Sequence, residues 1–303
     1  MKIVFMGTPD FAVPILDALN KKYEVKLVVS QPNRQKKKGV EIKTPVAEYA
    51  TSNNLLLFQP EKIKEDNEII MSCDADILVT AAYGQYIPSY ILEKFKCAIN
   101  VHGSLLPKHR GGAPIQRAIM QGDKFTGVTI MSMTKKLDAG LMYKKGEYEI
   151  KEDDTATKVF NELSIIGRDL LMSSIEDIYN GINKGEAQNE DEATFSPNIL
   201  PEEEKIDLSD TSVNIINKIK GLAYNPGAYL EVKGTKIKVF MAKEVKEYPN
   251  EVPGFVINTK KCIVIKTKDS AISLEQVLVP GKKIISGKDF SNGQKFFIQG
   301  EVI

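Results

Sequence analysis

The N-terminal residues alternate between strand-like and helix-like patterns in a way that permits few folds. Residues 2–6 form a short apolar run, which predicts a buried strand ending at Gly7. Residues 10–20 carry apolar side chains at helical spacing, and residues 24–30 predict a second strand. A strand, a helix and a strand within about thirty residues require a parallel sheet with a right-handed crossover. We therefore predict an α/β fold, with a Rossmann-like parallel sheet in an N-terminal domain.

Several classes of protein are disfavoured by what the sequence lacks. The turn at Gly7 does not continue into the Gly-x-Gly-x-x-Gly fingerprint, so a nicotinamide-dependent oxidoreductase loses its main support. Cys73, Cys97 and Cys262 have no paired spacing, which argues against a disulfide framework or a zinc site. We find no signal peptide, and no run reaches the roughly eighteen apolar residues of a membrane span. We expect a cytoplasmic protein that contacts no membrane and needs no metal.

A further apolar run, residues 97–101, ends in a group of polar side chains. Asn100 and His102 are two residues apart, so an extended backbone points both in the same direction. They lie at the carboxyl end of a predicted strand, where ligands bind in open α/β sheets. Asp138 follows a later apolar run, in a loop closed by Gly140. An imidazole that is oriented by a carboxylate, beside an amide donor, can stabilise an oxyanion and move a proton.

Other interpretations of these residues stay open at this point. His102 can be a core histidine whose hydrogen bonds are satisfied, and Asn100 can be a turn residue. Ser104 can be read as a nucleophile or as a turn residue. The Gly-x-Ser-x-Gly elbow of serine hydrolases is absent, which favours the turn. The residue types alone do not decide between a catalytic and a structural role.

Short motifs around these residues and elsewhere in the chain carry a family resemblance. The chain resembles the folate-dependent formyltransferase family in Asn-Val-His-Gly-Ser-Leu-Leu-Pro at residues 100–107, Gly-Val-Thr-Ile-Met at 127–131 and Leu-Asp-Ala-Gly at 137–140. It is similar to the branch that acts on initiator methionyl-tRNA in Gly-Thr-Pro-Asp-Phe-Ala at 7–12 and Gly-Gly-Ala-Pro-Ile-Gln-Arg-Ala at 111–118. The residue types, their order and their spacing all fit this family.

The resemblance implies a reaction and a set of residues for it. Members transfer a formyl group from 10-formyltetrahydrofolate to an amine, which assigns catalysis to Asn100, His102 and Asp138. It also implies a folate pocket lined by Ser104, Leu105, Leu106, Pro107, Gln85, Tyr86 and Ile87. For Tyr86, ordinary packing is an equal alternative. A sugar nucleotide is the nearest alternative substrate, because the N-formyltransferases that act on it share the same three catalytic residues.

Residues 31–44 form a predicted loop that is longer and more basic than an ordinary connection. Its one carboxylate, Glu41, stands against five cations: Arg34, Lys36, Lys37, Lys38 and Lys43. Such a loop suits a phosphate backbone, and the resemblance implies that it enters the acceptor arm of tRNA. A solvated loop without a partner is the alternative.

The chain changes character near residue 182. Residues 1–181 hold the catalytic pattern, whereas residues 182–205 are polar, rich in Asn, Glu and Gly, and predict a linker. Residues 206–303 contain short β-rich runs separated by turns, as in a small barrel, and the resemblance implies an OB-like tRNA-binding domain. Residues 207–303 carry 15 Lys and Arg against 10 Asp and Glu, which suits an anionic partner. We expect a monomer.

Overall fold

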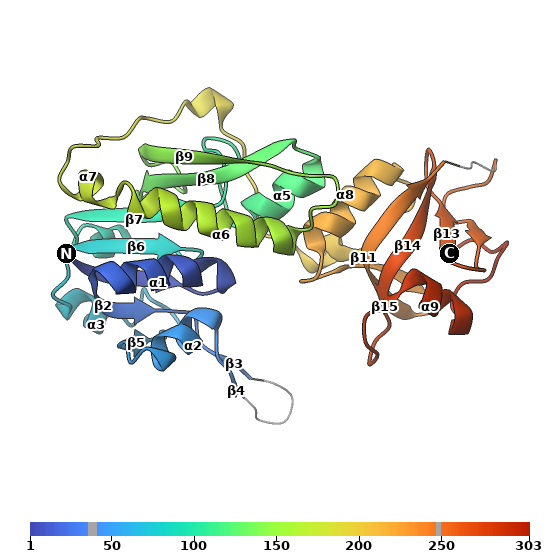
Figure 1. Ribbon diagram of the computed structural model, residues 1–303, viewed down its shortest axis with the longest axis horizontal. Coiled ribbons are helices and arrows are strands. Elements are labelled where there is room, and N and C mark those ends of the chain that lie inside the picture. The colour runs from blue at the N-terminus through green and yellow to red at the C-terminus, as the bar shows by residue number, and fades with distance from the viewer. Residues whose placement is uncertain (36–40, 247–249) are drawn as a thin grey trace. The chain divides into compact units, whose positions relative to one another are not determined.

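Strands from the first half of the chain pair into one sheet in the computed structural model, which describes residues 1–35, 41–246 and 250–303 (Figure 1). Within these residues the strand order is β5-β2-β1-β6-β7-β8-β9. The strands from β5 to β7 pair in parallel, as predicted, whereas β8 runs antiparallel to both β7 and β9. The sheet consists of β1 (Lys2–Gly7), β2 (Glu24–Val29), β5 (Leu57–Phe58), β6 (Ile77–Ala81), β7 (Cys97–His102), β8 (Phe125–Ser132) and β9 (Met142–Glu149).

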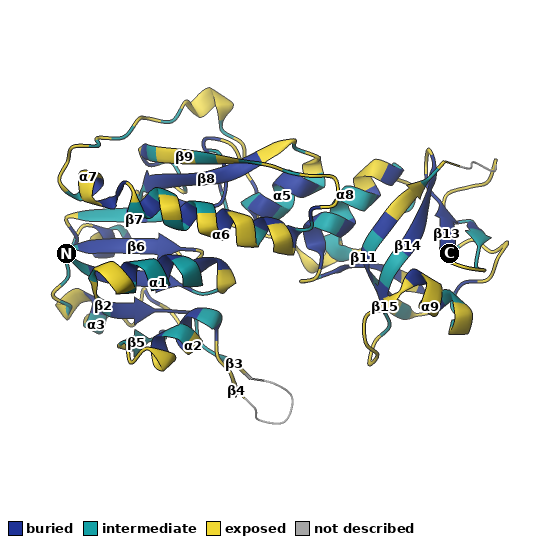
Figure 2. Cartoon of the chain, in the orientation of Figure 1, coloured by how far each residue is buried: buried dark blue, intermediate teal, exposed yellow. Residues whose placement is uncertain are grey.

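Burial along the strands explains their positions in the sheet. Every residue of β6 is buried, and β1 is buried after its first residue, as expected for parallel strands covered on both faces. Residues of β9 alternate in exposure, and β9 lies at the sheet edge (Figure 2). The helical segments of this half are η1 (Asp10–Ala12), α1 (Val13–Lys22), α2 (Pro45–Ser52), α3 (Glu68–Ser72), α4 (Ser89–Leu92), α5 (Pro114–Gln121), α6 (Ala156–Met172), α7 (Ile175–Tyr179) and η2 (Glu190–Glu192).

The second half of the chain forms an antiparallel, curled sheet, which confirms the predicted C-terminal β domain. In the described part its strand order is β10-β11-β14-β13-β12, and β15 pairs with β14. Ile215, Ile219 and Leu222 of α8, with Phe290 of α9, are buried in the same apolar core as the strands. The elements are η3 (Pro201–Glu204), α8 (Ser212–Leu222), β10 (Ala228–Val232), β11 (Thr235–Val245), β12 (Val256–Asn258), β13 (Ile263–Lys266), β14 (Ala271–Leu278), β15 (Ile285–Ser286) and α9 (Gly287–Gly293).

The described chain divides into two compact units that are interleaved in sequence. The N-terminal unit consists of Met1–Pro114, Phe125–Glu149 and Phe160–Pro197. The C-terminal unit consists of Ile115–Lys124, Ile150–Val159 and Asn198–Ile303. The predicted linker therefore contributes residues 182–197 to the first unit and residues 198–205 to the second.

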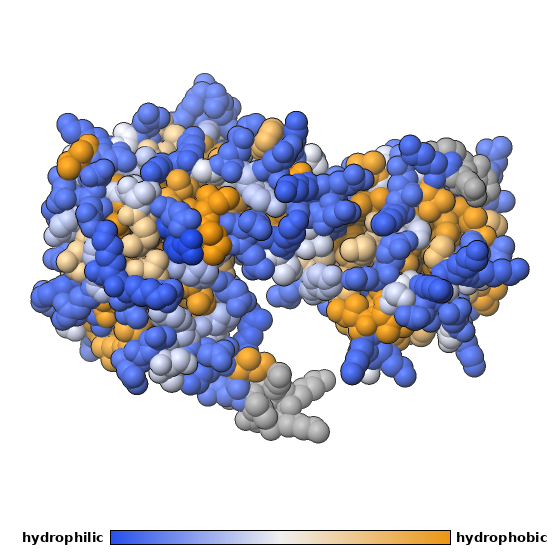
Figure 3. Space-filling view, viewed as in Figure 1, coloured by the Kyte–Doolittle hydropathy of each residue, from blue (hydrophilic) through white to orange (hydrophobic). Residues whose placement is uncertain are grey.

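Hydrophilic side chains cover most of the visible face of each unit, with apolar groups scattered among them (Figure 3). Among the helices that the structure describes, none combines the length and the apolar character that crossing a membrane requires.

Candidate active site

Asn100 lies near the carboxyl end of β7, and the neighbouring strand orients its amide. β6 and β7 pair in parallel with Thr80 directly opposite Asn100. The buried hydroxyl of Thr80 donates a 2.8 Å hydrogen bond to Oδ1 of Asn100. Since the amide oxygen accepts from Thr80, the amide nitrogen points the other way with its two N–H donors. The local structure thus presents Asn100 as a donor.

His102 ends β7, and its ring is fixed by a backbone carbonyl. Nε2 of His102 lies 3.0 Å from the carbonyl oxygen of His109. Because a carbonyl only accepts, Nε2 carries the proton of this hydrogen bond. Nδ1 faces the carboxylate of Asp138, with 3.8 Å between Nδ1 and Oδ2. The ring is buried, and among the described residues its Nε2 has a backbone partner while its Nδ1 faces the carboxylate.

Asp138 lies in the loop between β8 and β9 and adopts a backbone angle φ of +46°, which is uncommon for a residue other than glycine. Its Oδ2 accepts a 2.8 Å hydrogen bond from the backbone N–H of Gly111. The loop closes tightly at Gly140, where an added Cβ would lie 1.8 Å from the carbonyl oxygen of Ser132. The structure therefore brings Asn100 and His102 to one strand end and places Asp138 beside His102, the arrangement that the sequence suggested.

The predicted folate-binding turn, residues 104–107, is held by buried hydrogen bonds. The hydroxyl of Ser104, which is fully buried, donates to the carbonyl oxygen of Lys108 at 2.7 Å. The hydroxyl of Thr129 on β8 donates to the Ser104 carbonyl at 2.7 Å and accepts from the N–H of Leu106 at 3.1 Å. Leu106 and Pro107 are buried and Leu105 is half-buried. The Ser104 hydroxyl is thus occupied by the turn, which gives no support to its use as a nucleophile.

In the other predicted folate segment, residues 85–87, the side chain of Gln85 is taken up by hydrogen bonds to neighbouring loops. The Gln85 amide oxygen accepts from the N–H of Ile63 at 2.8 Å, and its nitrogen lies 3.2 Å from the carbonyl of Pro60. This side chain ties two loops together. Tyr86 is exposed and Ile87 is buried, so the Tyr86 ring does not contribute to the packing that its alternative interpretation assumed.

The basic segment contains a short hairpin in place of a simple loop. β3 (Arg34–Gln35) pairs with β4 (Glu41–Ile42), and Arg34 lies opposite Ile42. At the base of the hairpin, Asn33 accepts a hydrogen bond from the N–H of Thr44. Arg34 and Lys43 are exposed. The remaining predicted tRNA contacts, Lys36, Lys37 and Lys38, lie outside the described residues.

Comparison with known proteins identifies the family. A family profile described as "Formyl transferase" matches residues 1–175, and one described as "Formyl transferase, C-terminal domain" matches residues 198–295. The chain belongs to the formyl transferase family.

Two relatives align with this formyl transferase over nearly its whole length and carry a more specific name than the family. The chain is 43% identical to a protein named methionyl-tRNA formyltransferase from Streptococcus agalactiae serotype III, covering 96% of this chain and 95% of the relative. It is 42% identical to a protein of the same name from Lactobacillus gasseri, covering 99% and 98%. The solved N-formyltransferase from Helicobacter canadensis, in complex with folinic acid and dTDP-3-aminofucose, shares the fold, with a TM-score of 0.70 at 19% identity over 90% of this chain and 98% of that one.

Residues to which the sequence analysis gave no role in the site support the catalytic side chains of this formyl transferase. Thr80 orients Asn100, and the N–H of Gly111 holds Asp138. Arg110, whose side chain is fully buried, pairs with Glu190 at 3.0 Å. Hydrogen bonds from Arg110 and then from Lys136 lower the pKa of Glu190 to about 2. A threonine in an otherwise apolar strand, and an arginine within a glycine-rich stretch, were the available signals.

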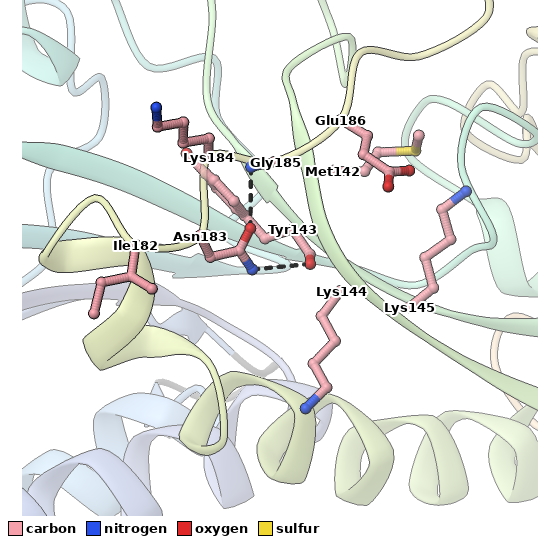
Figure 4. Close-up of a pocket in the computed structure, with 9 residues that line it drawn as sticks. All are labelled: Met142, Tyr143, Lys144, Lys145, Ile182, Asn183, Lys184, Gly185 and Glu186. Atoms are coloured by element: carbon pink, nitrogen blue, oxygen red, sulfur yellow. Dashed lines mark hydrogen bonds between the residues drawn. The ribbon is translucent and has the colours of Figure 1, made fainter.

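A separate pocket of about 460 Å³ lies between β9 and residues 182–186 (Figure 4). Its lining lysines, Lys144, Lys145 and Lys184, point in different directions, and Asn183 donates to the carbonyl of Tyr143. The pocket contains none of the predicted catalytic or folate-binding residues. Across the described residues, no group of three or more His, Cys, Asp or Glu is arranged to hold a metal ion.

Proposed function

We propose that this formyl transferase moves the formyl group of 10-formyltetrahydrofolate to the α-amino group of methionine on initiator methionyl-tRNA. The observation that carries the proposal is the 42–43% identity, over nearly the whole chain, to proteins named methionyl-tRNA formyltransferase. The match of the C-terminal family profile to residues 198–295 adds to it, because the likeness extends beyond the domain that carries the candidate site.

Asn100 has the role of stabilising negative charge. The folate supplies an electrophilic formyl carbon, and attack by the amine converts the formyl oxygen into an oxyanion. The Asn100 amide, whose oxygen is held by Thr80, directs its N–H donors toward that oxygen. A donor fixed in advance is strongest where charge develops in the transition state, because little reorganisation is needed there.

His102 has the role of moving the proton. With Nε2–H held on the His109 carbonyl, Nδ1 offers its lone pair on the side of Asp138 and accepts a proton from the attacking amine. The Asp138 carboxylate then lies beside a positively charged ring and stabilises it. The protonated ring returns the proton to the leaving nitrogen, either directly or through water.

The remaining assignments concern binding. Backbone groups of residues 85–87 and the turn at residues 104–107 form the folate pocket. The buried hydrogen bonds of Ser104, Leu106 and Thr129 support this assignment, because they fix the shape of the turn. The residues proposed to contact tRNA phosphates are Arg34, Lys36, Lys37, Lys38 and Lys43. The C-terminal unit contributes a second basic surface to tRNA binding, and the protein acts as a cytoplasmic monomer.

One assay tests the proposal. Purified full-length protein is incubated with 10-formyltetrahydrofolate and either charged initiator methionyl-tRNA or a sugar nucleotide with a free amine. We expect formylation of the tRNA and none of the sugar. Formylation of the sugar nucleotide with the tRNA left unmodified would replace the proposal by the sugar-nucleotide alternative.

A further inference from the structure

Residues 186–196 belong to the N-terminal unit and are bound along the candidate site. The N–H of Arg110 donates to the carbonyl of Thr194 at 2.8 Å, and the N–H of Ser196 donates to the carbonyl of Arg110 at 2.7 Å. At the other end, Met142 and Glu186 exchange backbone hydrogen bonds of 2.8 and 2.9 Å. This segment, which we call the strap, therefore pairs with the chain on both sides of Asp138.

The strap satisfies a buried cation. Nε and Nη2 of Arg110 donate to Oε1 of Gln188 at 3.0 and 2.8 Å, and Nη1 and Nη2 donate to the Glu190 carboxylate at 3.1 and 3.0 Å. A buried guanidinium is unfavourable unless its charge and its donors are met. Gln188 and Glu190 both belong to the strap, so the hydrogen bonds that satisfy the Arg110 guanidinium also fix the strap in place.

Arg110 also decides which way the Gln188 amide points. A guanidinium has donors only, so the amide oxygen must face it and the amide nitrogen must face away. That nitrogen donates to the carbonyl oxygens of Asp138 and Gly140, at 2.8 and 2.9 Å. One side chain thus ties both ends of the turn that places Asp138. Since Asp138 has a positive φ, its backbone is held in a conformation that L residues seldom adopt unaided.

Residues 109–111, which include Arg110, also hold the side chain of His102. The His109 carbonyl accepts from His102, Arg110 orients Gln188, and the Gly111 N–H binds Oδ2 of Asp138. Three consecutive residues therefore set the position of both His102 and Asp138. We infer that Gln188, with its amide oriented by Arg110, is a positioning residue for Asp138 in formyl transfer. This inference rests on the proposed role of Asp138.

Gln188→Glu tests the inference with a single-atom change. Glutamate keeps an acceptor for Arg110 but loses both donors to the turn, and it places an oxygen against two carbonyls. We expect kcat to fall about tenfold or more, because a small displacement of a catalytic group is costly, while KM for both substrates stays within about twofold. The control Asn189→Asp makes the same change of charge at the next residue, where Asn189 bonds to Asp191 and Glu192 of the strap itself. It should leave kcat unchanged.

A double-mutant cycle separates positioning from general structural damage. If Gln188 acts through Asp138, adding Gln188→Glu to Asp138→Ala should cost no further activity. Equal losses in both backgrounds, or wild-type kcat in Gln188→Glu, would overturn the inference. Full turnover in Asp138→Ala would instead remove Asp138 from the mechanism, which is a failure of the proposed function's residue roles. Thermal unfolding checks each variant, and Gln188→Met, of similar volume, enters the same cycle if Gln188→Glu does not fold.

Discussion

Nδ1 of His102 and Oδ2 of Asp138 lie 3.8 Å apart, farther than a hydrogen bond allows. Each is held from elsewhere: His102 by the His109 carbonyl and Asp138 by the Gly111 N–H. The two groups therefore keep their places without depending on a hydrogen bond to one another.

This independence makes truncation of each residue informative. We predict that Asn100→Ala, His102→Ala and Asp138→Ala each lower kcat by about a hundredfold or more, because each touches the transition state. Thermal unfolding should show that all three variants fold. A well-folded Asp138→Ala protein with near wild-type turnover would exclude the carboxylate from the reaction.

Thr80 provides a test of the oriented amide. Thr80→Val keeps the shape of the side chain but removes the hydrogen bond to Asn100, so the amide can turn. We predict a fall in kcat of about tenfold with little change in KM for the folate, as expected when an oxyanion donor is loosened rather than deleted. Thr80→Ser, which keeps the hydroxyl, should restore most of the activity. Equal activity of the valine and serine variants would mean that this bond does not matter.

Arg34 and Lys43 test the basic hairpin. Replacing both by alanine should weaken tRNA binding and flatten its dependence on salt, because each lost phosphate contact removes about 0.7–0.9 from the slope of log K against log salt. Affinity for the folate should stay the same. The matched control, Lys64→Ala with Lys184→Ala, removes two exposed cations elsewhere. If both double variants change tRNA binding equally, the effect is one of net charge and not of the hairpin.

The ion pair of Glu203 with Arg117 should contribute to thermal stability at neutral pH but not at strongly acid pH. Arg117 donates to both oxygens of Glu203, at 2.6 and 2.8 Å, and holds its pKa down to about 2. A carboxyl whose folded pKa is lowered contributes stability above its unfolded value of 4.5, and loses that contribution as the pH falls toward 2. Glu203→Gln should therefore have a lower Tm than wild type at pH 7 and the same Tm near pH 2. A gap in Tm that persists at pH 2 would show that the charge is not its source.

The sequence pattern predicts the parallel part of the sheet because an apolar run, a helix and a second run allow one local topology. It brings Asn100 and His102 together because their separation of two is a property of any strand. It does not predict Thr80 as the partner of Asn100, since the register of β6 against β7 is set by tertiary packing. It also gives no sign that Gln188 meets Arg110, because polar composition is equally consistent with a solvated segment and with a strap whose partners lie far away in the sequence. The hairpin of β3 and β4 was hidden for a similar reason, as its strands are only two residues each.

The interleaving of the two units limits how members of this family can be recombined. A chimaera that exchanges only residues 198–303 would leave Ile115–Lys124 and Ile150–Val159 behind, although both belong to the C-terminal unit. A complete exchange needs three pieces of chain. One of its junctions falls between Val159 and Phe160, inside α6, so the two parental sequences would have to share a continuous helix. Crossovers that preserve the whole of α6 from one parent are therefore the ones expected to yield folded hybrids.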